Sequence, residues 1–289
     1  MKISKVIIVI NESKPHAPNT ARELQRVLSA ENVEQEWIPT LVPSRDIYPK
    51  LNDMRGKTAD LVIACGGDGT LLQTAHRFRG SGIPILGINI GYLGFITSIR
   101  GDRIADEMNR VLKMDFVVSK RSALGVTVVQ GNQQTAGWAL NDAVIIRGDN
   151  PHLISLEAKV GKRRLTNYRC DGLIVATPTG STAYSLAAGG PIISPECHVL
   201  TVTPICPQAL TNRSVVVNSD ERVEMKLGSS SGPGVVQVDG MTLAKATPGT
   251  TVLVETARDE VPIAFLPEIN HYDILAEKLK WRGDVLGEP

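Results

Sequence analysis

The chain has 289 residues, a formal net charge of +1 and 42% hydrophobic residues. At about 150 residues per domain, this length predicts two domains with enough apolar residues for sizeable cores. The charge balance excludes a generic polybasic nucleic-acid binder, because binding by counterion release needs a surplus of cations.

The sequence predicts a cytoplasmic protein without a membrane segment or a zinc site. Its four cysteines form no CxxC pair, so we expect reduced thiols rather than metal ligands or disulfides. The five histidines show no metal-ligand spacing. The apolar run at residues 6–10 is too short for a signal peptide core, and no window approaches the roughly 18 apolar residues of a membrane span.

Residues 1–100 predict a Rossmann-like α/β domain. Continuous apolar runs, typical of buried parallel strands, occur at residues 6–10, 61–65 and 84–88. A helix capped by Asn19 is expected to run to about residue 30, and a second helix covers residues 71–78. This alternation of strands and helices indicates a parallel, doubly wound sheet.

After residue 115 the pattern changes to short β-branched runs separated by Gly, Asn, Pro and Ser. These runs occur at residues 126–129, 143–146, 173–176, 215–217, 235–238 and 251–254. The pattern is typical of an all-β domain of the β-sandwich type, with one helix expected near residues 182–188.

Helical periodicity returns in the tail at residues 272–281. We expect this tail to pack back on the first domain. The predicted domains are therefore residues 1–100 plus 266–289 for the α/β domain, and 101–265 for the β-sandwich.

The first segment that indicates chemistry is GGDGT, which follows the second predicted strand and opens a helix. Ligands bind at the carboxyl ends of strands in open α/β sheets. Gly67 and Gly69 would let the backbone approach a ligand and adopt positive φ, and Thr70 would cap a helix whose N–H groups favour phosphate. Asp68 is the carboxylate that this turn presents. The alternative is an ordinary Asp-Gly turn.

Known phosphate-binding sequences of other classes are missing. Neither the P-loop sequence GxxxxGK[ST] nor a GxGxxG after the first strand is present. Phosphate must therefore be held in another way.

The second segment is a strand that leads into the hydroxyl-rich sequence TPTGSTAYS. Hydroxyls and backbone N–H groups at a helix start suit a ribose, a base edge or a phosphate. A purely structural turn is the alternative. The candidate binding residues are Asp171, Thr182, Ala183, Tyr184 and Ser185.

Other single residues give weaker signals. Asn141 and Asp142 place an amide beside a carboxylate, which can bind a base edge and ribose hydroxyls or form a common turn. Phe95 ends the sequence GYLGF and belongs either beside a bound ring or in the core. Arg169 can pair with a phosphate or with an acid. His152, in a loop, is uninformative by itself.

Together these segments resemble the NAD kinase family in its bacterial, ATP-using form. Four motifs occur in order, namely GGDGT, GYLGF, Asn-Asp and the Asp-Gly strand that leads into TPTGSTAY, and the ending EKLKW is also similar. GGDGT alone occurs in related forms in lipid kinases and phosphofructokinases, whereas TPTGSTAY is specific. The resemblance spans nearly the whole chain.

The resemblance implies a homo-oligomer, dimer or tetramer, with an α/β domain, a β-sandwich and the dinucleotide between them. It implies transfer of the ATP γ-phosphoryl group to the 2′-hydroxyl of the adenosine ribose of NAD, giving NADP. Asp68 would be the general base, and a divalent cation, Mg²⁺, would be held mainly through the ATP phosphates. Family binding positions correspond to Asn141, Asp142, His152, Arg169, Asp171, Thr182, Ala183 and Tyr184.

Two departures from the family pattern and two other functions are noted. Met241 stands where the family commonly has Gln, and Ala187 where relatives often carry Ser. One alternative function is a related GGDGT kinase acting on a lipid or sugar phosphate, against which the hydroxyl-rich stretch argues. The other is a non-catalytic NAD-binding sensor, against which Asp68 argues, because binding alone needs no base.

Overall fold

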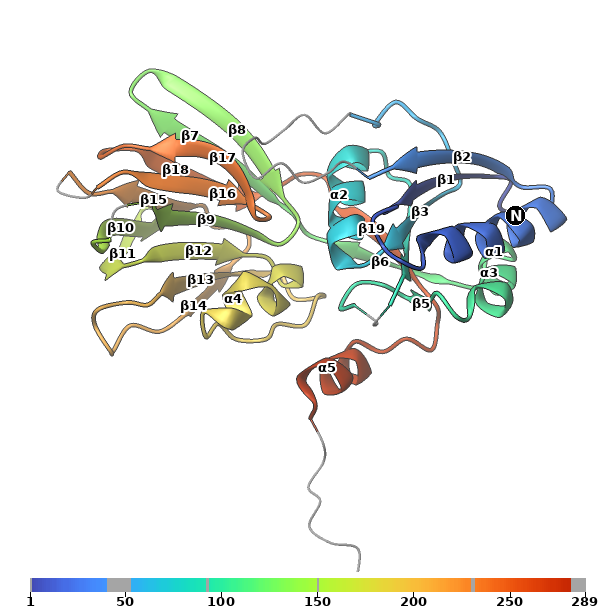
Figure 1. Cartoon of the computed structure of the whole chain (residues 1–289). Coiled ribbons are helices and arrows are strands. Elements are labelled where there is room, and N and C mark those ends of the chain that lie inside the picture. The colour runs from blue at the N-terminus through green and yellow to red at the C-terminus, as the bar shows by residue number, and fades with distance from the viewer. Residues whose placement is uncertain (1, 41–52, 92–93, 150, 230–231, 282–289) are drawn as a thin grey trace, which may run out of the picture. The chain divides into compact units, whose positions relative to one another are not determined.

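The computed structural model describes residues 2–40, 53–91, 94–149, 151–229 and 232–281, which form two compact units. Unit 1 takes its described residues from Met1–Val42, Asp53–Lys120 and Val261–Pro289, and unit 2 takes its own from Arg121–Glu260 (Figure 1). Tyr92 and Leu93 of the GYLGF sequence and residues 282–289 of the expected tail lie outside the described residues.

Unit 1 is built on a seven-stranded sheet in the order β2-β1-β3-β4-β19-β6, with β5 beside β4. The pairs β1–β2, β1–β3, β3–β4, β4–β5 and β4–β19 are parallel. The predicted parallel arrangement is therefore confirmed for these five pairs. Its strands are β1 (Lys5–Ile10), β2 (Glu34–Pro39), β3 (Leu61–Gly66), β4 (Ile85–Asn89), β5 (Ile99–Arg100), β6 (Val117–Arg121) and β19 (Val261–Phe265).

In the described residues, unit 1 also contains four helices: α1 (Ala17–Ala30), α2 (Asp68–Phe78), α3 (Ile104–Leu112) and α5 (His271–Leu279). The predicted cap at Asn19 is wrong, because α1 begins at Ala17 with His16 as its N-cap. Pro18 occupies the first turn, where its fixed φ and missing N–H are favourable. The Asn19 side chain instead accepts a hydrogen bond of 2.6 Å from Arg22.

The boundaries of unit 1 differ from the predicted domain boundaries at residues 100 and 266. The unit continues to Lys120 because α3 packs against α1 and buries Met108 and Val111 in the unit 1 core. It resumes at Val261 because β19 joins the sheet between β4 and β6. The chain that leaves unit 1 after β6 thus returns to the same sheet.

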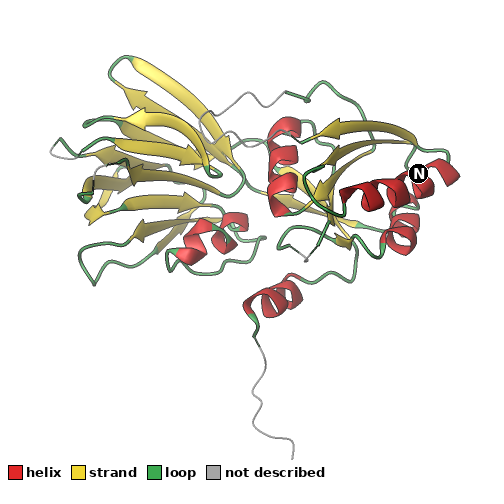
Figure 2. Cartoon of the chain, in the orientation of Figure 1, coloured by secondary structure: helices red, strands yellow, loops and turns green. Residues whose placement is uncertain are grey.

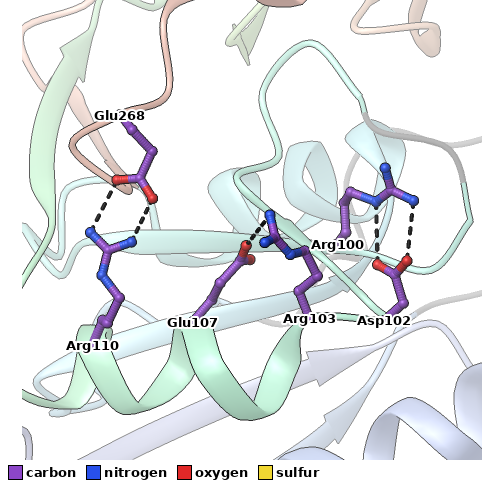
Figure 3. A network of polar contacts seen from close by, with 6 residues as sticks. All are labelled: Arg100, Asp102, Arg103, Glu107, Arg110 and Glu268. Carbon is purple, nitrogen blue, oxygen red and sulfur yellow. Dashed lines mark hydrogen bonds and ion pairs between the residues drawn. The ribbon is translucent and has the colours of Figure 1, made fainter.

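An ion-pair network links α3 to the segment that follows β19. Arg110 of α3 pairs with Glu268 through two hydrogen bonds, and Arg103 pairs with Glu107 one turn away (Figure 3). Arg110 and Glu268 are both solvent-exposed, so we expect the pair to orient the returning chain and to add little stability.

Unit 2 is a β-sandwich of two six-stranded sheets, in the orders β11-β10-β15-β18-β7-β8 and β14-β13-β12-β9-β16-β17 (Figure 2). A shared apolar core lies between the sheets, which confirms the predicted all-β domain. The strands are β7 (Leu124–Gln130), β8 (Gln133–Ala139), β9 (Asp142–Arg147), β10 (Ile154–Val160), β11 (Arg163–Cys170), β12 (Gly172–Ala176), β13 (Val199–Ile205), β14 (Val215–Asn218), β15 (Val223–Leu227), β16 (Gly234–Val238), β17 (Met241–Ala246) and β18 (Thr251–Thr256).

The helix predicted near residues 182–188 is a 3₁₀ turn, η1 (Thr179–Thr182), followed by the short helix α4 (Tyr184–Ala187). It lies against the sheet that contains β9 and β12. The inner residues of these strands join the sandwich core, whereas Val144 and Ile174 form a second cluster with Ala188 after α4. Because both faces are covered, these strands are continuously apolar, and the hydroxyl-rich turn is held on the sheet.

Within the described parts of the chain, no helix has both the length and the apolar character needed to cross a bilayer.

Candidate functional site

In unit 1, the GGDGT segment joins β3 to α2. Gly67 is the N-cap and Asp68 the first residue of α2, so the prediction that Thr70 caps this helix is wrong. Thr70 lies in the first turn, and its N–H donates to the carbonyl oxygen of Gly67 at 2.9 Å. A Cβ at Gly66 would lie 2.1 Å from Thr70 Oγ1, so close packing of this turn requires that glycine.

The Asp68 carboxylate is held by the backbone of the GYLGF segment. Its Oδ2 accepts the Phe95 N–H at 2.8 Å, and its Oδ1 accepts the Ile96 N–H at 3.2 Å. A Cβ at Gly94 would lie only 1.9 Å from Oδ1. The structure therefore brings two predicted motifs together, and Phe95 contributes its N–H while its ring is half-buried.

Gly67 and Gly69 flank this carboxylate without being required by the fold. Gly67 has an extended φ of −176° and neither glycine has a positive φ, so that part of the prediction is wrong. A Cβ at either position would meet no described atom within 4 Å. The first N–H groups of a helix lack intrahelical partners, so this open space beside α2 suits a phosphate.

In unit 2, the Asn141–Asp142 turn is joined to the hydroxyl-rich turn. Thr177 donates its N–H to the Asn141 carbonyl oxygen at 2.9 Å and its hydroxyl to the Leu140 carbonyl oxygen at 2.6 Å. Gly180 donates its N–H to Thr177 Oγ1 at 3.0 Å. A Cβ at Gly180 would lie 2.0 Å from the Asn141 oxygen, so the two turns form one closely packed unit.

Asp142 is a buried carboxyl at the start of β9. Its pKa is raised to about 7, first by burial and then by the charge of Asp239, and the backbone N–H of Tyr184 partly offsets this shift. Burial disfavours the charged form of a carboxyl, and a like charge adds to the effect. Asp142 can therefore change its protonation state near neutral pH.

Asp239 is a residue that the sequence analysis did not identify as part of the site. Its carboxylate accepts three successive backbone N–H groups, those of Leu140 at 2.8 Å, Asn141 at 2.8 Å and Asp142 at 3.1 Å. An Asp-Gly pair between two strands is a strong hairpin signal, and this signal was available at residues 239–240.

The charged candidates of unit 2 lie in different surroundings. Asp171 Oδ1 accepts a hydrogen bond of 2.6 Å from Arg147 Nε, and the two side chains form an ion pair. Arg169 is exposed on β11 and forms no ion pair with any described acid. His152 is exposed in the loop between β9 and β10.

The remaining candidates lie on η1 and α4. Thr182 is half-buried and donates its hydroxyl to the Thr179 carbonyl oxygen at 3.2 Å, and Ala183 beside it is half-buried. Ser185 is fully buried, with its hydroxyl 3.1 Å from Thr203 Oγ1, so it anchors α4 to β13. Tyr184 keeps 38% of its surface exposed and offers an aromatic ring.

No cluster of three or more His, Cys, Asp or Glu side chains that could hold a metal ion occurs among the residues described. One of the two departures from the family pattern has a role in packing. Met241, the first residue of β17, packs against the sandwich core.

A parallel α/β unit with a carboxylate at a helix start, joined to a β-sandwich with a hydroxyl-rich turn, defines a nucleotide-binding protein. Family profiles described as the ATP-NAD kinase N-terminal and C-terminal domains match residues 6–116 and 140–265. The chain belongs to the NAD kinase family.

Curated relatives match almost the whole chain. The NAD kinase of Heliobacterium modesticaldum is 39% identical over 277 residues, covering 94% of this chain and 97% of the relative. The NAD kinase of Symbiobacterium thermophilum is 40% identical over 280 residues, covering 95% and 98%.

Solved structures share the fold. Yeast NADH kinase complexed with NADH superposes with a TM-score of 0.86 at 25% identity, covering 100% of this chain and 91% of the yeast chain. An NAD kinase from Archaeoglobus fulgidus in complex with ATP has a TM-score of 0.74 at 22% identity, covering 96% and 100%.

Proposed function

We propose that this chain is an ATP-dependent NAD kinase, which transfers the ATP γ-phosphoryl group to the 2′-hydroxyl of the adenosine ribose of NAD and releases NADP and ADP. The observation that carries the proposal is the Asp68 carboxylate, fixed by two backbone N–H groups beside an open helix N-terminus. The curated relatives, named NAD kinase over nearly their full length, support it.

Asp68 would act on the acceptor hydroxyl. A ribose hydroxyl is a poor nucleophile, so catalysis of phosphoryl transfer depends on positioning and charge neutralisation. Each carboxylate oxygen has lone pairs beyond the one used by its N–H donor, so Asp68 can still accept the hydroxyl's hydrogen bond. As the new P–O bond forms, Asp68 would take the proton as general base.

The phosphates of ATP would lie against Gly67 and Gly69. A side chain at either position would occupy space that the fold leaves free, and the helix N-terminus supplies N–H donors with a favourable dipole. Glycine at these two positions therefore suits close approach of a ligand.

The dinucleotide would be bound by unit 2. The Asn141 amide and the Asp142 carboxyl offer polar groups to a base edge and to ribose hydroxyls. The partly exposed ring of Tyr184 can stack on the adenine, next to Thr182 and Ala183. The other proposed binding residues are His152, Arg169 and Asp171. The hydrogen bond from Arg147 orients the Asp171 carboxylate.

A divalent cation, Mg²⁺, would neutralise the triphosphate charge and be held mainly through the ATP phosphates and water. The described residues fit this mode of binding, because no cluster of three or more His, Cys, Asp or Glu side chains that could hold a metal ion occurs among them. We further propose that the enzyme is cytoplasmic, which its four free cysteines support. We also propose that it is a homo-oligomer, which the family resemblance supports.

The test is NADP formation by the purified chain with NAD, ATP and Mg²⁺, measured by a cycling assay specific for NADP. Polyphosphate in place of ATP, NADH in place of NAD, and a panel of lipid and sugar phosphates define the donor and the acceptor. We expect NADP and stoichiometric ADP from ATP and NAD. NAD binding without product, or phosphorylation of a lipid or sugar phosphate in preference to NAD, would contradict the proposal.

A further inference from the structure

We propose that Asp239 is a positioning residue for NAD, which acts by fixing the Asn141–Asp142 turn. The inference rests on the proposed function, because it concerns the dinucleotide site of unit 2. Asp239 belongs to the hairpin between β16 and β17, whereas the turn it holds precedes β9.

The contacts define how Asp239 acts. Oδ2 accepts the N–H of Leu140, and Oδ1 accepts those of Asn141 and Asp142, so one carboxylate fixes three consecutive peptide groups. In return, the Asp239 N–H donates to the Asp142 carbonyl oxygen at 2.9 Å. Charge-assisted hydrogen bonds of this kind are stronger than neutral ones.

The opposite side of the turn is fixed by the hydroxyl-rich segment. Thr177 donates to the carbonyl oxygens of Leu140 and Asn141, while Asp239 accepts from the N–H groups. The backbone polar groups of the turn are therefore largely used within the protein. The Asn141 side chain remains for a ligand, and the buried Asp142 carboxyl, which also accepts the Tyr184 N–H, keeps lone pairs beyond that bond. The directions of both side chains follow from the fixed backbone.

The conformation and the charge of Asp239 argue that its carboxylate serves more than the hairpin. Its φ of 48° lies in the left-handed region, which Asp and Asn tolerate alike, so the hairpin by itself does not require a carboxylate at this position. Its charge also acts on the buried Asp142 carboxyl. Asn adopts the left-handed conformation readily and would close the hairpin without placing a second carboxylate there.

The main variant is Asp239→Asn. Its amide oxygen can still accept the two N–H groups that Oδ1 accepts, but its NH₂ group then faces the Leu140 N–H, donor against donor. We expect the KM and Kd for NAD to rise by about tenfold or more, with kcat within about threefold and the KM for ATP within about twofold.

A second readout separates positioning from a general loss of structure. The charged group that acts on Asp142 is Asp239, and the backbone N–H of Tyr184 partly offsets its effect. Removing the Asp239 charge lowers the pKa of Asp142, so the acid limb of NAD binding should move to lower pH in Asp239→Asn. An unchanged acid limb would contradict the coupling of Asp239 to the NAD site through Asp142.

Asp60→Asn is the matched control. Asp60 Oδ2 also accepts two successive backbone N–H groups, those of Ser4 at 2.7 Å and Lys5 at 3.0 Å, but Asp60 directly precedes β3 in unit 1. We expect this variant to lose thermal stability while its KM for NAD stays within about twofold of the wild type.

Asp239→Gly keeps the proposal testable if the Asn variant folds poorly. Glycine removes the carboxylate and adopts the left-handed conformation readily, so the hairpin should form and the KM for NAD should still rise about tenfold. Folded Asn and Gly variants with wild-type Kd for NAD, or with equal losses for NAD and ATP, would overturn the inference. Calorimetric NAD binding tests it even if the wild type forms no NADP, an outcome that refutes only the proposed activity.

Discussion

At the scale of single residues, Asp142 shows how the fold sets the chemistry of a side chain. Burial and the charge of Asp239 raise the pKa of this carboxyl to about 7, although the backbone N–H of Tyr184 partly offsets the shift. In the unfolded chain the same carboxyl ionises near its ordinary pKa of about 4. Between about pH 4 and pH 7 the Asp142 carboxyl keeps its proton in the folded protein but loses it in the unfolded chain. The stability of the native state therefore falls as the pH rises through this range.

The variant Asp142→Asn removes this ionisation and tests the sign of the effect. We expect its stability relative to the wild type to be nearly unchanged at about pH 4, to increase up to about pH 7, and to stay level above that. Above pH 7 the gain in Tm should be about 5 °C. Thermal unfolding in buffers from pH 4 to pH 9 checks this, and a gain that falls with rising pH contradicts the assignment.

Local sequence identifies some site residues and not others. Asp68 was predicted because it follows an apolar strand directly, and a strand end is a known location for ligands. Asn141 was predicted because its amide stands beside a carboxylate. Asp239 was not identified, because its partners lie 97 to 99 residues away along the chain. Nothing in an Asp-Gly pair indicates which backbone groups its carboxylate will meet once two strands pair.

At the scale of elements, the loop after β4 clamps the first turn of α2. Thr97 supports the loop by accepting the Gly94 N–H at 2.9 Å. A Cβ at Gly94 would overlap the Asp68 carboxylate, so Gly94→Ala should displace Asp68 and lower kcat by about 100-fold or more. Gly56→Ala is the control, since a Cβ there meets no described atom. Steady-state kinetics compare the two, and equal activities would contradict the clamp.

The predictability of an element followed from its burial. Strands β1, β3, β9 and β12 were predicted because they are buried on both faces and therefore continuously apolar. Strands β8 and β11, which are largely exposed and polar, were not predicted. Helix α3 was missed although Ile104, Met108 and Val111 have helical spacing, so a signal existed there. Strand β19 was also not predicted, because it has only five residues and contains a proline.

At the scale of the whole molecule, the proposal assigns the metal to the substrate rather than to the protein. Chelation with EDTA should therefore abolish activity and leave the Tm of the nucleotide-free protein within about 1 °C of its starting value. Added Mg²⁺ should restore turnover. Differential scanning fluorimetry with and without ATP measures this, and a large fall in Tm on chelation without nucleotide would reveal a protein-held metal.

The two units have different proposed roles. Unit 1 contains the Asp68 carboxylate and the phosphate-facing turn, and unit 2 contains the dinucleotide-facing turns. We therefore expect that a substitution of Asp68 lowers turnover while NAD binding persists. The Asp68→Asn variant is the direct case, and its Asn side chain retains an acceptor for one of the two loop N–H groups.

The decisive measurement is therefore NADP formation by Asp68→Asn beside the wild type, with the Kd for NAD measured on the same samples and Asp60→Asn as a folded control. We expect kcat to fall by at least about 100-fold in Asp68→Asn, with the Kd for NAD changed by less than about threefold. Near-normal turnover by Asp68→Asn would contradict the account, because it would remove this carboxylate from the reaction.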